Sequence, residues 1–83
     1  MSIEDEVRGF ITTELGWAGS PSDLTPDYDL LGNDVIDSIA IFQLVSFIEE
    51  RYSIEVADEA LVPDNFQTLA AISNLVNTSE KTG

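Results

Sequence analysis

The residues best placed to do chemistry are Asp37-Ser38-Ile39, where a turn-rich segment changes into a long apolar run. A serine in the first turn of a helix directs its hydroxyl outward, beside backbone N–H groups that have no partner within the helix. The positive end of the helix dipole lies at the same place and favours a phosphate there. Ser38 is therefore a candidate for three roles: a helix cap, a nucleophile, or the attachment point of a phosphorylated group.

The sequence offers Ser38 no catalytic partner of the usual kind. The chain has no histidine and no cysteine, and its three basic residues are Arg8, Arg51 and Lys81. Without these side chains, a serine nucleophile lacks the commonest general base, and no imidazole or thiolate can bind a metal. We therefore expect neither a catalytic residue nor an enzyme, and Asp37 is the expected N-cap of the helix that begins at Ser38.

Asp27-Tyr28-Asp29-Leu30-Leu31-Gly32 matches the opening of a calcium-binding loop, with acids at the first and third positions and glycine at the sixth. The fifth position would be Leu31, which offers no side-chain oxygen. The twelfth would be Ser38, where a bidentate glutamate is needed. The match fails at two ligands, so we predict no metal site.

Length and composition indicate one small acidic domain. The chain has 83 residues, 43% of them hydrophobic, and a net charge of −13. One modest core fits this size, and we expect a single domain over 1–83, with an ordered core at about 2–77 and a polar tail at 78–83. The charge excludes nucleic-acid backbones and anionic membranes as partners and favours proteins that present basic patches.

Targeting signals are not evident in the sequence. The start of the chain has no basic region followed by an apolar run, and no apolar run approaches the length of a membrane span. We expect a cytoplasmic protein, and we take a monomer as its expected oligomeric state.

Apolar spacing predicts an all-α fold. Apolar residues recur at spacings of three and four in two long segments, which predicts one helix from about Ser2 to Leu15 and a second from Ser38 to about Tyr52. A third helix is expected from Leu69 to about Asn77, with Thr68 as its cap. A short helical turn is expected at Pro63-Asp64-Asn65, because proline suits the start of a helix. Together these elements predict a four-helix bundle with three long helices and one short one.

Two segments connect the predicted helices. Residues 17–37 are punctuated by glycine and proline and should form a long loop that delivers the chain to Ser38. Residues 53–62 should form a connector without a strand, because the alternation in Ser53-Ile54-Glu55-Val56 has no partner strand in the chain. The helix from Ser38 is too apolar for a single stripe, which is typical of a central helix that also exposes a contact surface.

At these residues the chain resembles a carrier protein of the acyl/peptidyl carrier family. The family's attachment motif is an aspartate, the modified serine, then leucine or isoleucine at the start of the second helix, here Asp37-Ser38-Ile39. The tripeptide alone is common, whereas an ordered set of motifs at these spacings is specific. The further motifs are Leu30-Leu31-Gly32, Ile48-Glu49-Glu50-Arg51-Tyr52, Ile54-Glu55-Val56-Ala57-Asp58-Glu59 and Phe66-Gln67-Thr68-Leu69-Ala70-Ala71-Ile72.

The resemblance implies a four-helix carrier fold with phosphopantetheine attached covalently to Ser38. A phosphopantetheinyl transferase would add this arm from coenzyme A, and the terminal thiol would hold an acyl or aminoacyl group as a thioester. Further implied partners are a loading enzyme, which is an adenylation enzyme or an acyltransferase, and downstream tailoring or condensing enzymes. Those partners do the chemistry, while the carrier supplies the attachment site and a docking surface.

One departure from the family pattern concerns docking. Carriers of primary fatty acid synthesis place acidic residues just after the serine, whereas this chain has Ala40, Ile41 and Gln43. We therefore predict docking by hydrophobic contact, and the pattern is more similar to discrete carriers of nonribosomal peptide or polyketide pathways. The predicted partner-contact residues are Ile39, Ala40, Ile41, Gln43, Val56 and Val62, the last two within a contributing segment at 56–62.

A small acidic interaction module, such as an inhibitor or a nucleic-acid mimic without a prosthetic group, is the alternative. A mimic needs acids arrayed on one rigid face, whereas here they are scattered through loops and the start of the first helix. The carrier interpretation is therefore preferred.

Overall fold

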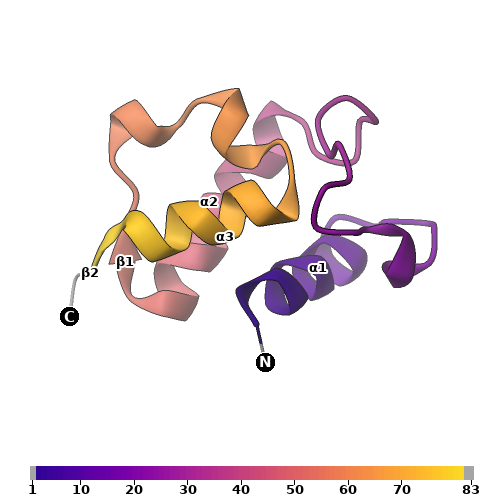
Figure 1. Ribbon diagram of the computed structural model, residues 1–83, viewed down its shortest axis with the longest axis horizontal. Coiled ribbons are helices and arrows are strands. Elements are labelled where there is room, and N and C mark those ends of the chain that lie inside the picture. The colour runs from indigo at the N-terminus through magenta and orange to yellow at the C-terminus, as the bar shows by residue number, and fades with distance from the viewer. Residues whose placement is uncertain (1, 82–83) are drawn as a thin grey trace.

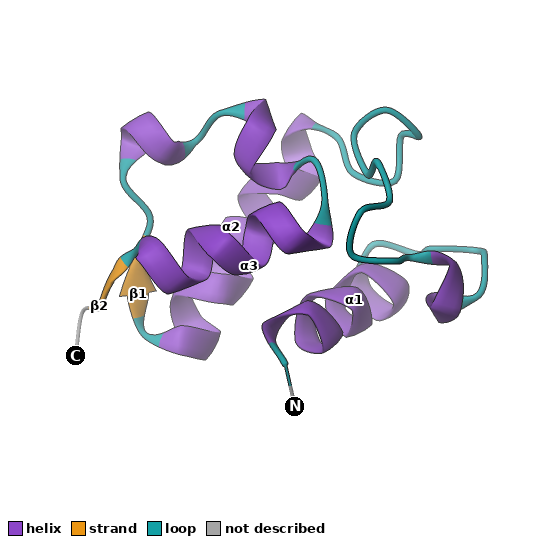
Figure 2. Cartoon of the chain, in the orientation of Figure 1, coloured by secondary structure: helices purple, strands orange, loops and turns teal. Residues whose placement is uncertain are grey.

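The computed structural model describes residues 2–81 and contains three α-helices as its main elements (Figure 1). Three short 3₁₀ helices and two two-residue strands lie between and after them. Figure 2 colours all helices purple and the strands orange. The predicted all-α class is confirmed, with the short helix present as 3₁₀ turns. In chain order the elements are α1 (Ile3–Glu14), η1 (Pro21–Asp23), α2 (Ser38–Tyr52), β1 (Ile54–Glu55), η2 (Asp58–Ala60), η3 (Pro63–Phe66), α3 (Leu69–Thr78) and β2 (Glu80–Lys81).

Each α-helix begins at a side chain that caps it. Ser2 Oγ accepts a hydrogen bond from the Asp5 amide at 3.1 Å, and Thr68 Oγ1 accepts one from the Ala71 amide at 3.0 Å. Such caps satisfy backbone donors that have no partner within the helix. Helix α1 ends at Glu14, and Gly16 follows with φ +72°, a conformation in which glycine avoids the steric cost of a side chain. The helices predicted from apolar spacing are confirmed to within a residue at each end.

The core lies where the three α-helices meet, with α1 packed against α3 and α2. Between α1 and α2, the rings of Phe10 and Phe47 stack with centroids 4.6 Å apart. A core of this size is held together mainly by burial of apolar side chains, to which each of the three α-helices contributes. The largest fully buried side chains are Phe66, Ile11, Leu24, Leu30, Ile36, Leu44, Ile48, Leu69, Ile72 and Val7.

The long loop before α2 is fixed to the rest of the fold by its backbone. Leu30 donates its amide to the Gln67 carbonyl oxygen at 2.7 Å, and the Ala70 amide donates to the Pro26 carbonyl oxygen at 3.0 Å. Both contacts join the loop to the start of α3. The segment that leads into Ser38 is therefore ordered by contacts with a helix that lies far away in the sequence.

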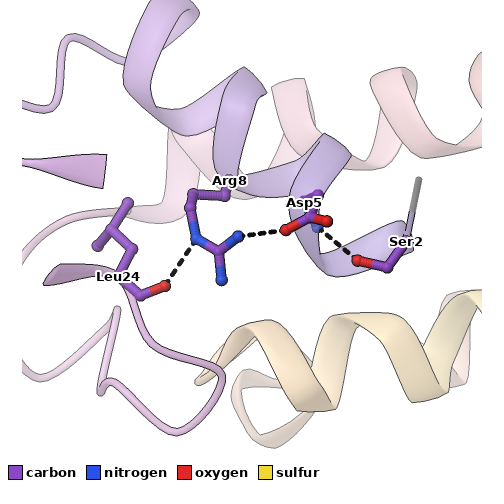
Figure 3. A network of polar contacts seen from close by, with 4 residues as sticks. All are labelled: Ser2, Asp5, Arg8 and Leu24. Atoms are coloured by element: carbon purple, nitrogen blue, oxygen red, sulfur yellow. Dashed lines mark hydrogen bonds and ion pairs between the residues drawn. The ribbon is translucent and has the colours of Figure 1, made fainter. Parts of the chain in front are cut away.

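An arginine on α1 ties the same loop to the first helix (Figure 3). Arg8 Nε donates to the Leu24 carbonyl oxygen at 2.9 Å, and its Nη1 pairs with Asp5 Oδ1 at 2.6 Å. Hydrogen bonding from Arg8 and Ser2 lowers the pKa of the Asp5 carboxyl below its ordinary value. One of the three basic side chains of the protein thus makes its contacts within the fold.

The expectation of a connector without a strand was wrong. Strand β1 pairs antiparallel with β2, with Ile54 opposite Lys81 and Glu55 opposite Glu80. The partner strand comes from the segment expected to be a polar tail, in which Thr78 ends α3 and Glu80–Lys81 form β2. The rest of that predicted tail, residues 82–83, lies outside the described residues.

Candidate functional site

Ser38 is the first residue of α2, and Asp37 caps the helix in front of it. Asp37 Oδ1 accepts a hydrogen bond from the Ala40 amide at 2.8 Å, and the Asp37 carbonyl oxygen accepts one from Ile41 at 2.9 Å. The cap predicted from the sequence is confirmed. Because Asp37 fulfils the capping role, the Ser38 hydroxyl is not needed for it.

The Ser38 side chain is exposed, and no hydrogen bond within residues 2–81 uses its hydroxyl. The first amides of a helix lack intrahelical acceptors, so the N–H groups of Ser38 and Ile39 face the space beside this hydroxyl. Together with the helix dipole, these donors favour a phosphodiester attached at Oγ. The position therefore fits a phosphorylated group joined to the serine.

A shallow apolar groove of about 240 Å³ begins at Ser38 and runs between α2 and the η3 region. It is lined on one side by residues of α2 and on the other by residues between Leu61 and Phe66, of which Phe66 is fully buried. An apolar groove beside an attachment point can cover an apolar segment or receive part of a docking protein. The residues lining it are Ser38, Ile41, Phe42, Leu61, Val62, Pro63 and Phe66.

A second hollow of about 390 Å³ lies on the other side of the α2 N-terminus, against the end of α1. It is acidic, because Glu14, Asp34 and Asp37 all line it. Asp34 adopts φ 57°, a left-handed conformation that aspartate tolerates better than most residues. Ile39 and Gln43 form the edge that this hollow shares with α2. The surface around Ser38 is therefore apolar on one side and acidic on the other.

Four of the predicted partner-contact residues lie where a partner can reach them. Ile39 is 70% exposed and Val62 is 42% exposed. Gln43 is also exposed, and Ile41 is half-buried in the wall of the apolar groove. Their role in docking stays a prediction, but their placement is compatible with it.

Two of the predicted contact residues are buried. Ala40 is buried because it shares the inner face of α2 with Leu44 and Ile48, which follow at helical spacings of four. Val56 is buried because its amide is held by Glu49 Oε2 at 3.0 Å and its side chain joins the core. The prediction that Ala40 and Val56 form part of the contact surface was therefore wrong.

Sequence reasoning missed Phe42 as a surface residue. Its apolar type groups it with Val45, Ile48 and Tyr52 on one side of the helix, yet the ring is 65% exposed. The available signal was the apolar content of α2, which exceeds what one buried stripe can hold. With Ile39 and Val62, Phe42 makes up the large hydrophobic side chains that are exposed within residues 2–81.

The far end of α2 is anchored to α1 by a polar cluster. The Glu6 carboxylate pairs with Arg51 and accepts a hydrogen bond from the Tyr52 hydroxyl. These two hydrogen bonds, from Tyr52 first and Arg51 second, lower the pKa of Glu6. Burial, together with the hydrogen bond to Glu6, raises the pKa of Tyr52. The cluster holds the orientation of α2 but lies at the opposite end from Ser38.

Comparison with known proteins agrees with this geometry. The family described as "Phosphopantetheine attachment site" matches residues 5–76. Acyl carrier proteins from three serovars of Chlamydia trachomatis are 30% identical over 59 residues, which covers 71% of this chain and 74% of theirs. The solution NMR structure of a holo acyl carrier protein from Nitrosomonas europaea superposes with a TM-score of 0.78 at 27% identity, covering 93% of this chain and 94% of that one.

The chain therefore belongs to the family of carrier proteins that bear phosphopantetheine. Its prosthetic group is phosphopantetheine, held by a covalent bond. The residues around Ser38 fit such a group, because an exposed hydroxyl stands beside helix N-terminal amides and an apolar groove. No helix within residues 2–81 has the length and apolar character that crossing a bilayer requires.

Proposed function

We propose that Ser38 is the attachment site and that the chain carries aminoacyl or acyl groups, as thioesters, between biosynthetic enzymes. The observation that carries this proposal is the division of labour at the start of α2. Asp37 caps the helix through the Ala40 amide, while Ser38 keeps an exposed and uncommitted hydroxyl. A serine needed only for helix stability would itself accept the capping hydrogen bond.

Attachment follows ordinary phosphoryl chemistry on a transferase. Ser38 Oγ forms a bond to the phosphorus that bears pantetheine in coenzyme A, and the bond from that phosphorus to the adenosine 3′,5′-bisphosphate leaving group breaks. The hydroxyl proton passes to a base of the transferase, since this chain has no histidine to accept it. The chain's own contribution is to present Oγ and to place backbone N–H donors beside the phosphodiester.

When bound, the prosthetic group supplies the thiol that this cysteine-free chain lacks. Partner enzymes would make and break the thioester, so the chain is proposed as a carrier without catalytic activity of its own. We expect the carrier to act in the cytoplasm.

We also propose that the pathway belongs to secondary metabolism, of the nonribosomal peptide or polyketide kind. The support is the surface after Ser38, where the first turn of α2 contains no acidic residue and Ile39 and Phe42 are exposed. A surface of this kind selects partners by apolar fit more than by charge. An adenylating enzyme that loads the purified holo chain would indicate an aminoacyl cargo, and an acyltransferase that does so would indicate an acyl cargo.

The test of the proposed function is the intact mass of the chain before and after incubation with coenzyme A and a broad-specificity phosphopantetheinyl transferase. We expect a gain of one phosphopantetheinyl unit, with fragmentation placing it on Ser38. The matched control is Ser38→Ala, which should gain nothing. A folded wild-type sample that starts without the group and gains none would favour the acidic interaction module instead.

A further inference from the structure

We propose that Gln67 is a positioning residue for the attachment of the prosthetic group to Ser38. Its side chain, hydrogen-bonded to Asp29, holds the loop that leads into Ser38 against the segment that lines one side of the apolar groove. The serine and the groove thereby keep a single relative placement when a transferase acts on the chain. This inference rests on the proposed function, because it takes Ser38 as the residue that is modified.

Gln67 joins the loop through two hydrogen bonds that run in opposite directions. Its carbonyl oxygen accepts from the Leu30 amide at 2.7 Å, and its Nε2 donates to Asp29 Oδ1 at 3.2 Å. The first bond uses only the backbone of residue 67, whereas the second needs a side chain that donates. A carboxylate only accepts hydrogen bonds, so the amide nitrogen of Gln67 is the group that faces it. The identity of Gln67 therefore matters through its contact with Asp29.

On the groove side, Gln67 is placed by the two elements between which it lies. It is the C-cap of η3, whose first and last residues, Pro63 and Phe66, line the apolar groove together with Ser38. Phe66 is fully buried, and Thr68, the residue after Gln67, caps α3. Figure 1 shows the start of α3 beside the loop that precedes α2. Because its neighbours on both sides are held in the fold, Gln67 offers the loop a fixed point of attachment.

On the loop side, a series of contacts connects Asp29 with the residues just before Ser38. Leu30 follows Asp29 directly and is fully buried. Its carbonyl oxygen accepts from the amides of Val35 at 2.9 Å and Ile36 at 3.4 Å. Ile36 is also buried and lies two residues before Ser38. A displacement of Asp29 should therefore change the placement of the serine as well.

The contact between Asp29 and Gln67 depends on the type of side chain at position 67. Within residues 2–81, the hydrogen bonds to the Asp29 carboxylate come from uncharged amides, those of Gly32 and Gln67. Gln67→Lys keeps a donor, and its charge strengthens the bond to a carboxylate. Gln67→Leu removes the donor, and Gln67→Glu replaces it with a second carboxylate that repels the first. Attachment at Ser38 should therefore be fastest for wild type and Gln67→Lys and slowest for Gln67→Glu.

The helix dipole acts on the same substitutions in the opposite direction. Position 67 lies just before the N-cap of α3, where the positive end of the dipole favours an acidic side chain and disfavours a basic one. The dipole alone would therefore make Gln67→Glu the more stable variant and Gln67→Lys the less stable one. A slow Gln67→Glu and a fast Gln67→Lys cannot be attributed to the dipole.

The experiment measures kcat and KM for transfer of phosphopantetheine from coenzyme A to the full chain by a broad-specificity transferase, with the chain as the varied substrate. We expect Gln67→Leu to lower kcat about threefold and Gln67→Glu about tenfold, with KM within about twofold of wild type. The exposed side chains around Ser38 stay the same in these variants, while the placement of its hydroxyl becomes less defined. Gln67→Lys should keep kcat within about twofold of wild type.

Hydrogen exchange locates the change within the chain. The amides of Val35 and Ile36 should exchange faster in Gln67→Leu and Gln67→Glu than in wild type, while those of Leu44 and Ile48 within α2 stay protected. The matched controls are Asn74→Leu, Asn74→Glu and Asn74→Lys, because Asn74 is an exposed amide residue on α3 and the charge changes are the same. These controls should match wild type in both measurements.

The outcomes separate the positioning role from its alternatives. If Gln67→Glu keeps the wild-type kcat, or if Gln67→Lys loses as much as Gln67→Leu, Gln67 does not position Ser38. A rise in KM with kcat unchanged would make Gln67 a docking residue and would also overturn the positioning role, as would equal losses in the Asn74 controls. Failure of the wild-type chain to load at all would instead overturn the proposed function.

Discussion

Oδ1 of Asp37 lies 2.8 Å from the amide nitrogen of Ala40, so the residue before Ser38 performs the capping that Ser38 would otherwise provide. Asp37 thus has the structural task of capping the helix, and Ser38 is left for the proposed attachment of the prosthetic group. Helix stability and attachment chemistry should respond to different substitutions.

The first prediction concerns these two residues. Asp37→Ala should lower the free energy of unfolding by about 1 kcal/mol, because the Ala40 amide loses its acceptor. Ser38→Ala should change it by less than about 0.5 kcal/mol, since the Ser38 side chain is exposed and its hydroxyl makes no hydrogen bond within residues 2–81. Urea unfolding of both variants and of wild type measures these changes in the free energy of unfolding. A larger loss for Ser38→Ala than for Asp37→Ala would show that the serine is the true cap.

The second prediction compares two phenylalanines on either side of the apolar groove. Phe66 is fully buried and Phe42 is 65% exposed. Phe66→Ala should cost about 3–5 kcal/mol, because it removes buried surface and leaves a cavity. Phe42→Ala should cost less than about 0.5 kcal/mol. The same unfolding measurement tests both, and equal costs would mean that the Phe42 ring belongs to the core.

The third prediction concerns Gly32, which lies in the loop that leads to Ser38. A Cβ at this position would stand 2.0 Å from Asp29 Oδ2 and would displace that carboxylate. Asp29 Oδ1 accepts hydrogen bonds from the Gly32 amide at 2.8 Å and from Gln67 Nε2 at 3.2 Å. Gly32→Ala should therefore destabilise the fold by about 1–2 kcal/mol and loosen the loop.

Hydrogen exchange of the amides over residues 29–36 reports the loosening directly. Gly9→Ala is the matched control, because a Cβ at Gly9 meets nothing within 4 Å and Gly9 lies within α1. That control should leave the stability unchanged or raise it, since alanine favours a helix more than glycine does. If Gly32→Ala exchanges like wild type, the Asp29 contacts do not order the loop.

The fourth prediction concerns pH. The folded state lowers the pKa of Glu6 below its ordinary value of 4.5, so the stability that Glu6 contributes is complete above that value. It is lost as the pH falls from there through the lowered pKa. Unfolding free energies at about pH 7 and about pH 3 should therefore differ more for wild type than for Glu6→Gln. Tyr52→Phe should give an intermediate difference, because the hydroxyl that stabilises the carboxylate is gone.

Much of the fold follows from local patterns in the sequence. Apolar spacing located the three α-helices, and the side chains at Ser2, Asp37 and Thr68 marked their starts because capping depends on a few neighbouring residues. The β1–β2 pair was not predicted, because pairing of two-residue segments depends on their proximity in the folded chain and not on the local sequence. Only the folded chain brings Glu55 opposite Glu80.

The chemistry of the candidate site could be predicted from the sequence, whereas the identity of the exposed side chains around it could not. The types and order of Asp37 and Ser38, together with the wider ordered set of motifs, sufficed to propose an attachment position, since both residues lie at the start of one helix. Which apolar residues of α2 face outward depends on how the helix packs against its neighbours. For that reason Ala40 was misassigned to the surface and Phe42 was not recognised there.

The concentration of exposed apolar side chains beside Ser38 also bears on how copies of the chain behave toward one another. The net charge is −13, so two copies that approach through these patches repel each other at neutral pH and low salt. A cationic enzyme experiences attraction at the same spot. The negative charge thus opposes self-association of the chain. It keeps the exposed apolar side chains beside Ser38 available to other proteins even at high concentrations of the chain.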